Sequence, residues 1–324
     1  MRTLLVSLCF VLTNGISFAA DDNSGPKLLD PDDVTIASRR PAQPQGSNAS
    51  IRIDVNMALV PVTVLDTLGH NVTGLDRENF RVFDGSEQRP IVSFAQTDAP
   101  VSVGLIFDCS RSMRDKFRIA REAPAELFKQ LNPDDESFLV TVSDRPQMRQ
   151  DFTNAFNDIQ SALLFTNPDG TTSLLDGVFL GLQQLKKAHN PRKALIVVSD
   201  GGDNNSRYTL HELASLAAES DTQIFSICLF EHPQTVEEQD GPELLTKLAQ
   251  SSGGINYMIS RVDEMQHAFG KVGVTLHNQY VLGYYPPDNT QSGKYRKITV
   301  QLLVPAGLPR LHVYSRNGYY VPER

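Results

Sequence analysis

Residues 101–112 read VSVGLIFDCSRS, and this stretch sets the fold class. The first seven residues, Val101–Phe107, are an almost continuous apolar run of strand length, which predicts a strand buried on both faces. Asp108, Ser110 and Ser112 follow directly. We therefore expect a buried strand that delivers a carboxylate and two hydroxyls to its carboxyl end.

From residue 101 to about residue 278, short apolar runs alternate with stretches of helical periodicity. Such alternation predicts a doubly wound, mostly parallel sheet of six strands. Pro124 is expected to kink the first helix rather than end it. The strands are predicted at Val101–Phe107, Ser137–Val142, Gln147–Phe152, Ala194–Ser199, Gln223–Leu229 and Ile255–Ile259. The helices are predicted at Met113–Leu131, Ala155–Leu164, Leu174–Ala188, Leu210–Glu219, Pro242–Ser251 and Val262–His277.

Both flanks of this α/β unit alternate with a period of two. Residues 51–97 and 279–324 contain such runs, separated by Gly and Asp turns. This pattern predicts antiparallel strands. We expect the two flanks to form one smaller β-sandwich-like domain, into which the α/β unit, residues 98–278, is inserted.

The first 50 residues predict export rather than a folded domain. Residues 1–20 combine a positive start, a short apolar stretch and small residues at positions −3 and −1 of a cleavage site after Ala19 or Ala20, as in a secretory signal peptide. Residues 21–50 are polar and Pro-rich, which is typical of a flexible leader. No other stretch approaches the roughly 18 apolar residues of a membrane helix. The mature protein is expected in the periplasm or outside the cell.

Charge and cysteine content narrow the function classes. The 324 residues carry a formal net charge of −8, which argues against nucleic acid or anionic membranes as partners. Two cysteines, Cys109 and Cys228, remain after removal of the predicted signal peptide. Their predicted places in the sheet do not suit a disulfide, so free thiols are expected.

Three separate segments supply oxygen ligands at predicted strand ends or loops: Asp108 to Ser112, Gly170 to Thr172, and Ser199-Asp200. In a doubly wound sheet of order 3-2-1-4-5-6, the first and fourth strands are neighbours where the order reverses. Their carboxyl ends should therefore meet in one crevice. Carboxylate and hydroxyl oxygens suit a hard cation such as Mg²⁺, with Mn²⁺ or Ca²⁺ as alternatives.

The pattern Asp108-x-Ser110-x-Ser112, with Thr172 and Asp200, resembles the metal-ion-dependent adhesion site of von Willebrand factor A domains and integrin inserted domains. The resemblance covers about residues 100–278. It implies that the metal residues are Asp108, Ser110, Ser112, Thr172 and Asp200. It also implies a role in adhesion, in which the cation binds an acidic residue of a partner protein.

The flanks are similar to a group of exported Acidobacteria proteins that carry a related domain. The similar segments begin at Val60, Val72, Asn79 and Tyr280. Arg111 departs from the adhesion-site pattern, because many members of the family carry Gly there. Its guanidinium either influences the cation and an acidic ligand or points into solvent.

Two other function classes stay open at this point. The cation could simply stabilise a structural or scaffold protein of the cell envelope. An enzyme is the less favoured reading, because the chain lacks a Gly-x-Ser-x-Gly elbow, a His-Glu-x-x-His motif and a phosphate-binding Gly-x-x-x-x-Gly-Lys loop. We therefore expect a binding protein without catalytic residues.

Overall fold

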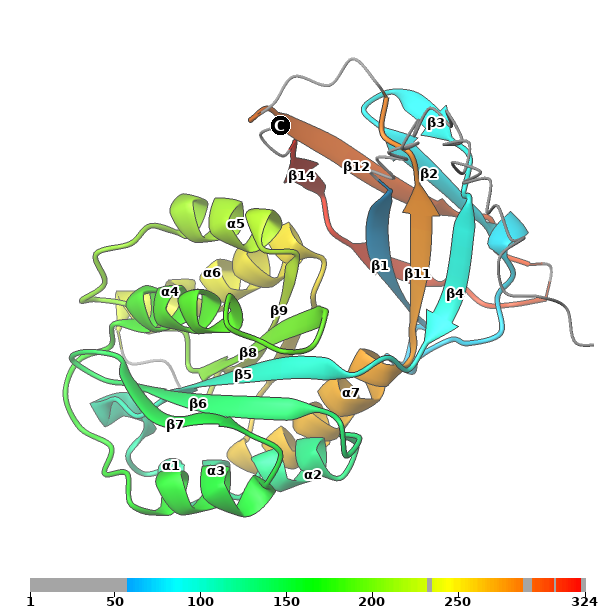
Figure 1. Ribbon diagram of the computed structural model, residues 1–324. Coiled ribbons are helices and arrows are strands. Elements are labelled where there is room, and N and C mark those ends of the chain that lie inside the picture. The colour runs from blue at the N-terminus through cyan, green and yellow to red at the C-terminus, as the bar shows by residue number, and fades with distance from the viewer. Residues whose placement is uncertain (1–56, 232–234, 288–292, 306, 322–324) are drawn as a thin grey trace, which may run out of the picture. The chain divides into compact units, whose positions relative to one another are not determined.

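The computed structural model describes residues 57–231, 235–287, 293–305 and 307–321, which belong to one compact unit (Figure 1). The predicted signal peptide, the polar leader and the strand residues 51–56 lie outside the described residues. Within the described ranges, no helix has the length and apolar character needed to cross a membrane.

A six-stranded sheet forms the centre of the α/β part. Its order is β10-β9-β8-β5-β6-β7, and all neighbours are parallel except β6 and β7. Numbered along the chain, this is the expected order 3-2-1-4-5-6, so the predicted doubly wound, mostly parallel sheet is confirmed. The strands are β5 (Val101–Asp108), β6 (Glu136–Val142), β7 (Gln147–Thr153), β8 (Arg192–Ser199), β9 (Thr222–Leu229) and β10 (Asn256–Ile259).

Helices cover both faces of this sheet, as Figure 1 shows. One face packs against α1 (Phe117–Ala120), α2 (Pro124–Phe128), α3 (Phe156–Leu164) and α7 (Met265–His277). The other face packs against α4 (Leu174–Leu185), α5 (Leu210–Glu219) and α6 (Val236–Ser252). Leu105 and Phe107 of β5 enter the first core, whereas Ile106 enters the second. Burial on both sides explains why β5 is apolar without alternation.

Two predicted helices differ from the structure. The segment Met113–Leu131 is not one kinked helix but three short pieces: a 3₁₀ turn η2 (Arg111–Met113), α1 and α2. Pro124 is the first residue of α2, where its missing N–H costs nothing and its fixed φ suits a helix start. The helix expected at Pro242 begins at Val236, because the Thr235 hydroxyl accepts a hydrogen bond from the Glu238 N–H.

The remaining strands form two antiparallel sheets, each built from both ends of the chain. One has the order β13-β1-β11-β4 and the other β14-β12-β2-β3. They share a core that includes Val62, Phe80, Leu282 and Ile298. The strands are β1 (Ala58–Leu65), β2 (Phe80–Asp84), β3 (Glu87–Arg89), β4 (Ser93–Thr97), β11 (Gln279–Tyr284), β12 (Tyr295–Leu302), β13 (His312–Ser315) and β14 (Gly318–Tyr320); the 3₁₀ turns η1 (Arg77–Asn79) and η3 (Val262–Glu264) complete the elements.

Candidate metal site

Asp108 and Asp200 lie at the carboxyl ends of adjacent strands. Asp108 is the last residue of β5, and Asp200 follows the last residue of β8. The two strands are parallel neighbours in register, with Phe107 opposite Val198. The sheet therefore places both carboxylates at the same edge, where its order reverses.

The first and third predicted segments touch directly. The Ser199 hydroxyl donates a hydrogen bond to Asp108 Oδ2 over 2.6 Å, and the Gly201 N–H donates to Ser199 Oγ over 2.9 Å. Asp108 and Ser199 are both fully buried. Ser199 thus locks the strand end that carries Asp108 to the loop that carries Asp200.

The second segment contacts both of the others through its backbone. The Asp169 N–H donates to the carbonyl of Cys109 over 2.9 Å, and the Arg111 N–H donates to the carbonyl of Gly170 over 3.2 Å. On the other side, the Thr172 carbonyl accepts hydrogen bonds from the N–H groups of Asn204 and Asn205, both at 3.1 Å. The three segments therefore adjoin one another in pairs, as the strand order predicts.

Two serines complete the loop after β5. The Ser110 N–H donates to Asp108 Oδ1 over 2.8 Å, and the hydroxyls of Ser110 and Ser112 lie 3.0 Å apart. Ser110 is buried and Ser112 is half-buried. Thr172 is buried as well. These hydroxyls are neutral oxygen donors beside the two acids.

The two carboxylates lack compensating positive charge at short range. Neither Asp108 nor Asp200 forms a salt bridge within the described part of the chain. Burial, and then the charge of Asp200, raises the pKa of Asp108 to about 7. Burial also raises the pKa of Asp200, against the opposing effects of the Ser112 side chain and the Lys116 charge. Buried ionised carboxylates are costly unless something pairs with them.

The donor set fits a hard cation. Asp200 Oδ2 is buried and has no hydrogen-bond partner among the described residues, so a ligand oxygen is free at the point where a cation is expected. Two carboxylates and three hydroxyls are the oxygen chemistry that Mg²⁺ accepts. The described residues contain no cluster of three or more His, Cys, Asp or Glu side chains suited to a metal. A cation here would therefore rely on the hydroxyls as well as the acids.

Two residues outside the five predicted metal residues hold the site in place. Ser199 positions Asp108, and Asn204 accepts a hydrogen bond from the Thr172 N–H through its Oδ1 at 3.1 Å. Ser199 precedes Asp200 in a segment already selected from the sequence, so its role beside Asp108 could have been predicted from its hydroxyl and its position. The role of Asn204 could not be predicted in this way, because it depends on the path of a loop.

Gly201 allows the chain to turn sharply after Asp200. Its φ is +89°, in the left-handed region that favours glycine. A Cβ on Gly201 would lie 2.4 Å from the Cα of Gly241, so a side chain has no room either. Glycine is therefore required after Asp200 by the backbone conformation and by the contact with Gly241, independently of any metal ligand.

Arg111 lies at the rim of the site. Its side chain is 73 % exposed, and its Nε lies 3.4 Å from Asp169 Oδ1. Arg114 makes a shorter ion pair with the same carboxylate oxygen, at 2.8 Å. The guanidinium of Arg111 is thus near solvent and held towards the loop that precedes Thr172.

Two further acids near the site have different surroundings. Asp176 accepts hydrogen bonds from the N–H groups of Arg207 and Tyr208 and forms an ion pair with the Arg207 guanidinium at 3.1 Å. These bonds hold the loop before α5, which is a structural role. Burial raises the pKa of Asp203, and its Oδ1 accepts a hydrogen bond from the Ser206 N–H.

Both cysteines that the structure describes are free and buried. The expectation of free thiols at Cys109 and Cys228 is therefore confirmed. Burial raises the pKa of the Cys228 thiol to about 12. It also raises the pKa of the Cys109 thiol well above its usual value. Neither thiol has the ionised character that reactivity requires.

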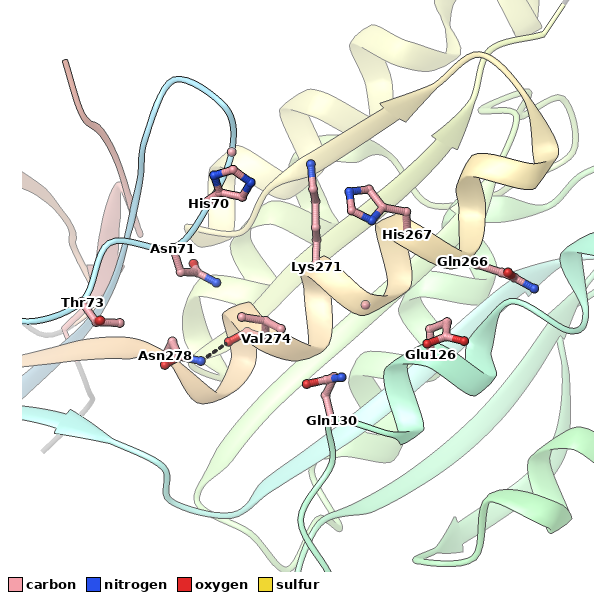
Figure 2. A pocket seen from close by; sticks show the side chains of 12 residues that line it. His70, Asn71, Thr73, Glu126, Gln130, Gln266, His267, Lys271, Val274 and Asn278 are labelled. Atoms are coloured by element: carbon pink, nitrogen blue, oxygen red, sulfur yellow. Dashed lines mark hydrogen bonds between the residues drawn. The ribbon is translucent and has the colours of Figure 1, made fainter. Parts of the chain in front are cut away.

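A separate polar cavity of about 730 Å³ lies beside α7 (Figure 2). Figure 2 shows Lys271 on α7 between His70 and His267, with Glu126 and Gln130 of the α2 region on the opposite wall. The five candidate metal residues do not line it. This cavity is therefore distinct from the candidate metal site.

Comparisons with known proteins bear on the α/β part. Residues 103–202 match the family model described as "von Willebrand factor type A domain". A search of curated proteins gives no match.

Several solved structures are similar to this chain at low sequence identity. BatB of Bacteroides thetaiotaomicron is 17 % identical, with a TM-score of 0.45 over 54 % of this chain and 98 % of that one. A "von Willebrand factor type A" structure from Catenulispora acidiphila is 13 % identical, with a TM-score of 0.48 over 75 % of this chain and 76 % of that one. The vWF domain of the pilus tip protein Mfa5 from Porphyromonas gingivalis is 12 % identical, with a TM-score of 0.45 over 56 % of this chain and 96 % of that one.

The family match covers β5, β6, β7 and β8, which include the strands that carry Asp108 and Asp200. The strand order of the sheet agrees with the fold that the resemblance implied. The chain thus contains a von Willebrand factor type A domain, matched over residues 103–202.

Proposed function

We propose that this protein binds a divalent cation at the candidate metal site and uses the cation to bind an acidic side chain of a partner protein. The proposed ligands are Asp108, Ser110, Ser112, Thr172 and Asp200. Mg²⁺ is the proposed cation, with Mn²⁺ or Ca²⁺ as alternatives. Asp108 and Asp200 would supply the negative charge, and the hydroxyls would supply neutral oxygens.

One observation carries this proposal: within the part of the chain that the structure describes, Asp200 Oδ2 is buried without a hydrogen-bond partner, next to the fully buried carboxylate of Asp108. Two buried acids that lack ion pairs raise the free energy of the folded state. A cation bound between them would remove that cost and satisfy the free oxygen.

The composition of the site supports an external acidic ligand. Three of the five proposed ligands are neutral, so two carboxylates alone would leave little negative charge around a divalent ion. Mg²⁺ also binds with near-octahedral geometry, which five protein oxygens do not complete. A carboxylate from a partner would fill the remaining position and add the missing charge.

We propose further that the mature protein acts in the periplasm or outside the cell, and that it is a binding protein rather than an enzyme. The signal peptide predicted at residues 1–20 supports the first statement. The second is supported by the site, whose carboxylates have serine neighbours rather than a histidine base. Screening with generic ester and phosphate substrates tests it.

A structural role is the alternative, because the free oxygen of Asp200 favours cation binding whether or not a partner follows. In that case the cation would only stabilise a scaffold protein of the cell envelope. The alternative predicts a cation-dependent melting temperature without cation-dependent partner binding.

The test combines both measurements on the mature protein. Thermal melts are recorded in Mg²⁺ and in EDTA, and partners are captured from envelope extract under the same two conditions. Asp108→Ala should remove both the Mg²⁺ stabilisation and the Mg²⁺-dependent capture. Asp134→Ala, an exposed acid at the opposite edge of the sheet, should change neither. Capture that persists unchanged in EDTA would exclude the adhesion mechanism.

A further inference from the structure

A second, mostly apolar cavity lies at the amino ends of the parallel strands, and we call it the basal cavity. Its volume is about 440 Å³, within the roughly 300–1,000 Å³ that small-molecule sites occupy. Its wall includes Val101, the first residue of β5, whereas Asp108 is the last residue of that strand. The strand length separates it from the candidate metal site by roughly 23 Å.

The walls of the basal cavity are largely hydrocarbon. One wall is the outward face of the β13-β1-β11-β4 sheet, represented by Leu59, Pro61 and Val281. Opposite lie Ala217 and Ala218 at the end of α5. Leu59 is 48 % exposed, so this apolar surface is not covered by other described residues. The other cavity, in Figure 2, is lined mainly by residues with polar side chains, such as Asn71, Gln130 and Gln266.

Positive charge is in excess at the basal cavity. Arg192, Lys193 and Arg316 line it, against one acid, Asp221. Asp221 pairs with Arg316. Lys193 is half-buried, and its ammonium makes no hydrogen bond or ion pair within the described part of the chain. One ammonium in an apolar cavity therefore lacks a counter-charge.

Arg316 contributes a free donor. The side chain is buried, with only 8 % exposure, and it donates from Nη2 to the carbonyl of Leu59 over 2.7 Å. Its Nε is buried and finds no hydrogen-bond partner in the described ranges. A buried N–H without an acceptor is rare in folded proteins and indicates a missing partner.

Arg192 is held by neutral oxygens. It donates to the carbonyl of Ala99 and to Gln279 Oε1, both over 2.9 Å, and to the carbonyl of Leu276. Burial lowers its pKa, against the opposing charges of Asp135 and Asp98. Its contacts fix the guanidinium at the cavity wall and do not supply a paired carboxylate.

We propose that the basal cavity binds a small amphipathic carboxylate, with its alkyl chain against the apolar walls and its carboxylate near Lys193 and Arg316. Charge complementarity argues for an anion, and the hydrocarbon walls argue for an alkyl chain. A carboxylate accepts charge-assisted hydrogen bonds, which are the strong ones in a partly desolvated site. This site is independent of the proposed cation-dependent function.

The test uses the full mature protein and octanoate as the probe, with calorimetry and thermal melts as readouts. Octan-1-ol and octylammonium have the same chain with a neutral or positive head. Lys193→Met removes the unpaired charge and keeps most of the side-chain volume. Lys186→Met, at an exposed lysine outside the cavity, is the matched control. Ala218→Leu narrows the cavity and tests whether the chain binds there.

Octanoate should bind and raise the melting temperature, octan-1-ol should bind more weakly, and octylammonium should not bind. Lys193→Met should weaken octanoate binding roughly tenfold, which is the scale of a hydrogen bond to a charged group. It should leave octan-1-ol unchanged, and Lys186→Met should leave both unchanged. Equal binding of all three probes, binding insensitive to both Lys193→Met and Ala218→Leu, or no octanoate binding at millimolar concentration would overturn the proposal.

Discussion

Asp108 determines the electrostatics of the candidate metal site. It is fully buried, and its pKa rises from 3.8 to about 7, first through burial and then through the charge of Asp200. A carboxyl with a raised pKa binds a proton more tightly in the folded state than in the unfolded state. The contribution of Asp108 to the free energy of unfolding of the metal-free protein should therefore fall as the pH rises from about 4 to about 7.

Asp108→Asn should reverse this loss. The amide keeps the shape and stays neutral, so the metal-free variant should gain on the order of 2 kcal/mol over wild type at pH 8. The same variant should lose its stabilisation by Mg²⁺. Urea unfolding in EDTA and in Mg²⁺, at pH 5 and pH 8, measures both effects. Wild type and variant that show the same pH dependence in EDTA would contradict this interpretation of Asp108.

The sequence was sufficient to select candidate metal residues, but not the residues that hold them in place. Asp108, Ser110 and Asp200 could be selected because their side chains follow predicted strands at a recognisable spacing. Asn204 could not be selected, since its bond to the Thr172 N–H depends on how the loop after β8 folds. The metal role of the selected residues stays a prediction.

Among the elements, the turn after β8 depends on glycine for two reasons. Gly201 has a φ of +89° and faces the backbone of Gly241. Gly74 has a similar φ of +79° but no atom within 4 Å of an added Cβ. Gly74→Ala therefore measures the cost of the backbone conformation alone.

Gly74→Ala should lower the free energy of unfolding by about 1 kcal/mol. Gly201→Ala should cost about 1–3 kcal/mol more, because it also overpacks the contact with Gly241. Urea unfolding of both variants provides the comparison. Equal costs would show that the α6 region moves away freely.

His277, at the end of α7, makes this helix end sensitive to pH. Its Nδ1 lies 2.6 Å from Asp98 Oδ1, and its Nε2 lies 3.2 Å from Asp135 Oδ2. Asp135 above all, followed by Asp98, raises the pKa of the imidazole above 6.5, against the effect of burial. The protonated His277, paired with Asp135 and Asp98, should stabilise the fold fully below pH 6.5. This stabilisation should be lost as the pH rises through the raised pKa of His277.

His277→Gln removes that titration. The difference in melting temperature between wild type and the variant should be largest at pH 5.5 and should shrink by pH 9. Taking the difference removes the pH dependence that Asp108 gives to both proteins. A difference that is constant across this range, or one that grows with pH, would disprove the assignment.

The positions of strands and helices were easier to predict than whether a helical segment is continuous or broken. The apolar runs located β5, β6, β8 and β9, because burial on both faces leaves a strong pattern. The edge strand β7 was also located, although it is polar and none of its residues is fully buried. The prediction of one kinked helix after β5 was wrong, because a proline in the middle of an apolar stretch is compatible both with a kink and with the start of a new helix. Only packing decides between the two, and here Pro124 begins α2.

For the whole molecule, Asp84 links strands from both ends of the chain. Its buried Oδ2 accepts hydrogen bonds from the hydroxyls of Tyr284 and Tyr319, each over 3.0 Å. Its Oδ1 pairs with Arg296 Nε at 2.5 Å. These contacts join β2, β11, β12 and β14, so they hold the two antiparallel sheets together.

Asp84→Ala should destabilise the protein by about 3–5 kcal/mol, because it leaves the Arg296 charge and two tyrosine hydroxyls without their acceptor. Glu87→Ala, on an exposed strand of the same sheet, should cost well under 1 kcal/mol. Denaturant unfolding distinguishes them. A small loss for Asp84→Ala would mean that the sheets are held mainly by their shared apolar core.

The insertion of an α/β unit between two antiparallel flanks was predictable from the change in periodicity at both borders. The partition of the flanking strands into two sheets was not. It depends on which strands meet across the core, for example β1 with β11 and β2 with β12, and periodicity carries no information about such pairing.

The most direct measurement of the central claim is titration calorimetry of Mg²⁺ into the mature protein after removal of bound metal with EDTA. Wild type and Asp134→Ala should each bind one Mg²⁺ per chain, and Asp108→Ala should bind none. No uptake of Mg²⁺, Mn²⁺ or Ca²⁺ by wild type, or equal uptake by Asp108→Ala, would contradict it.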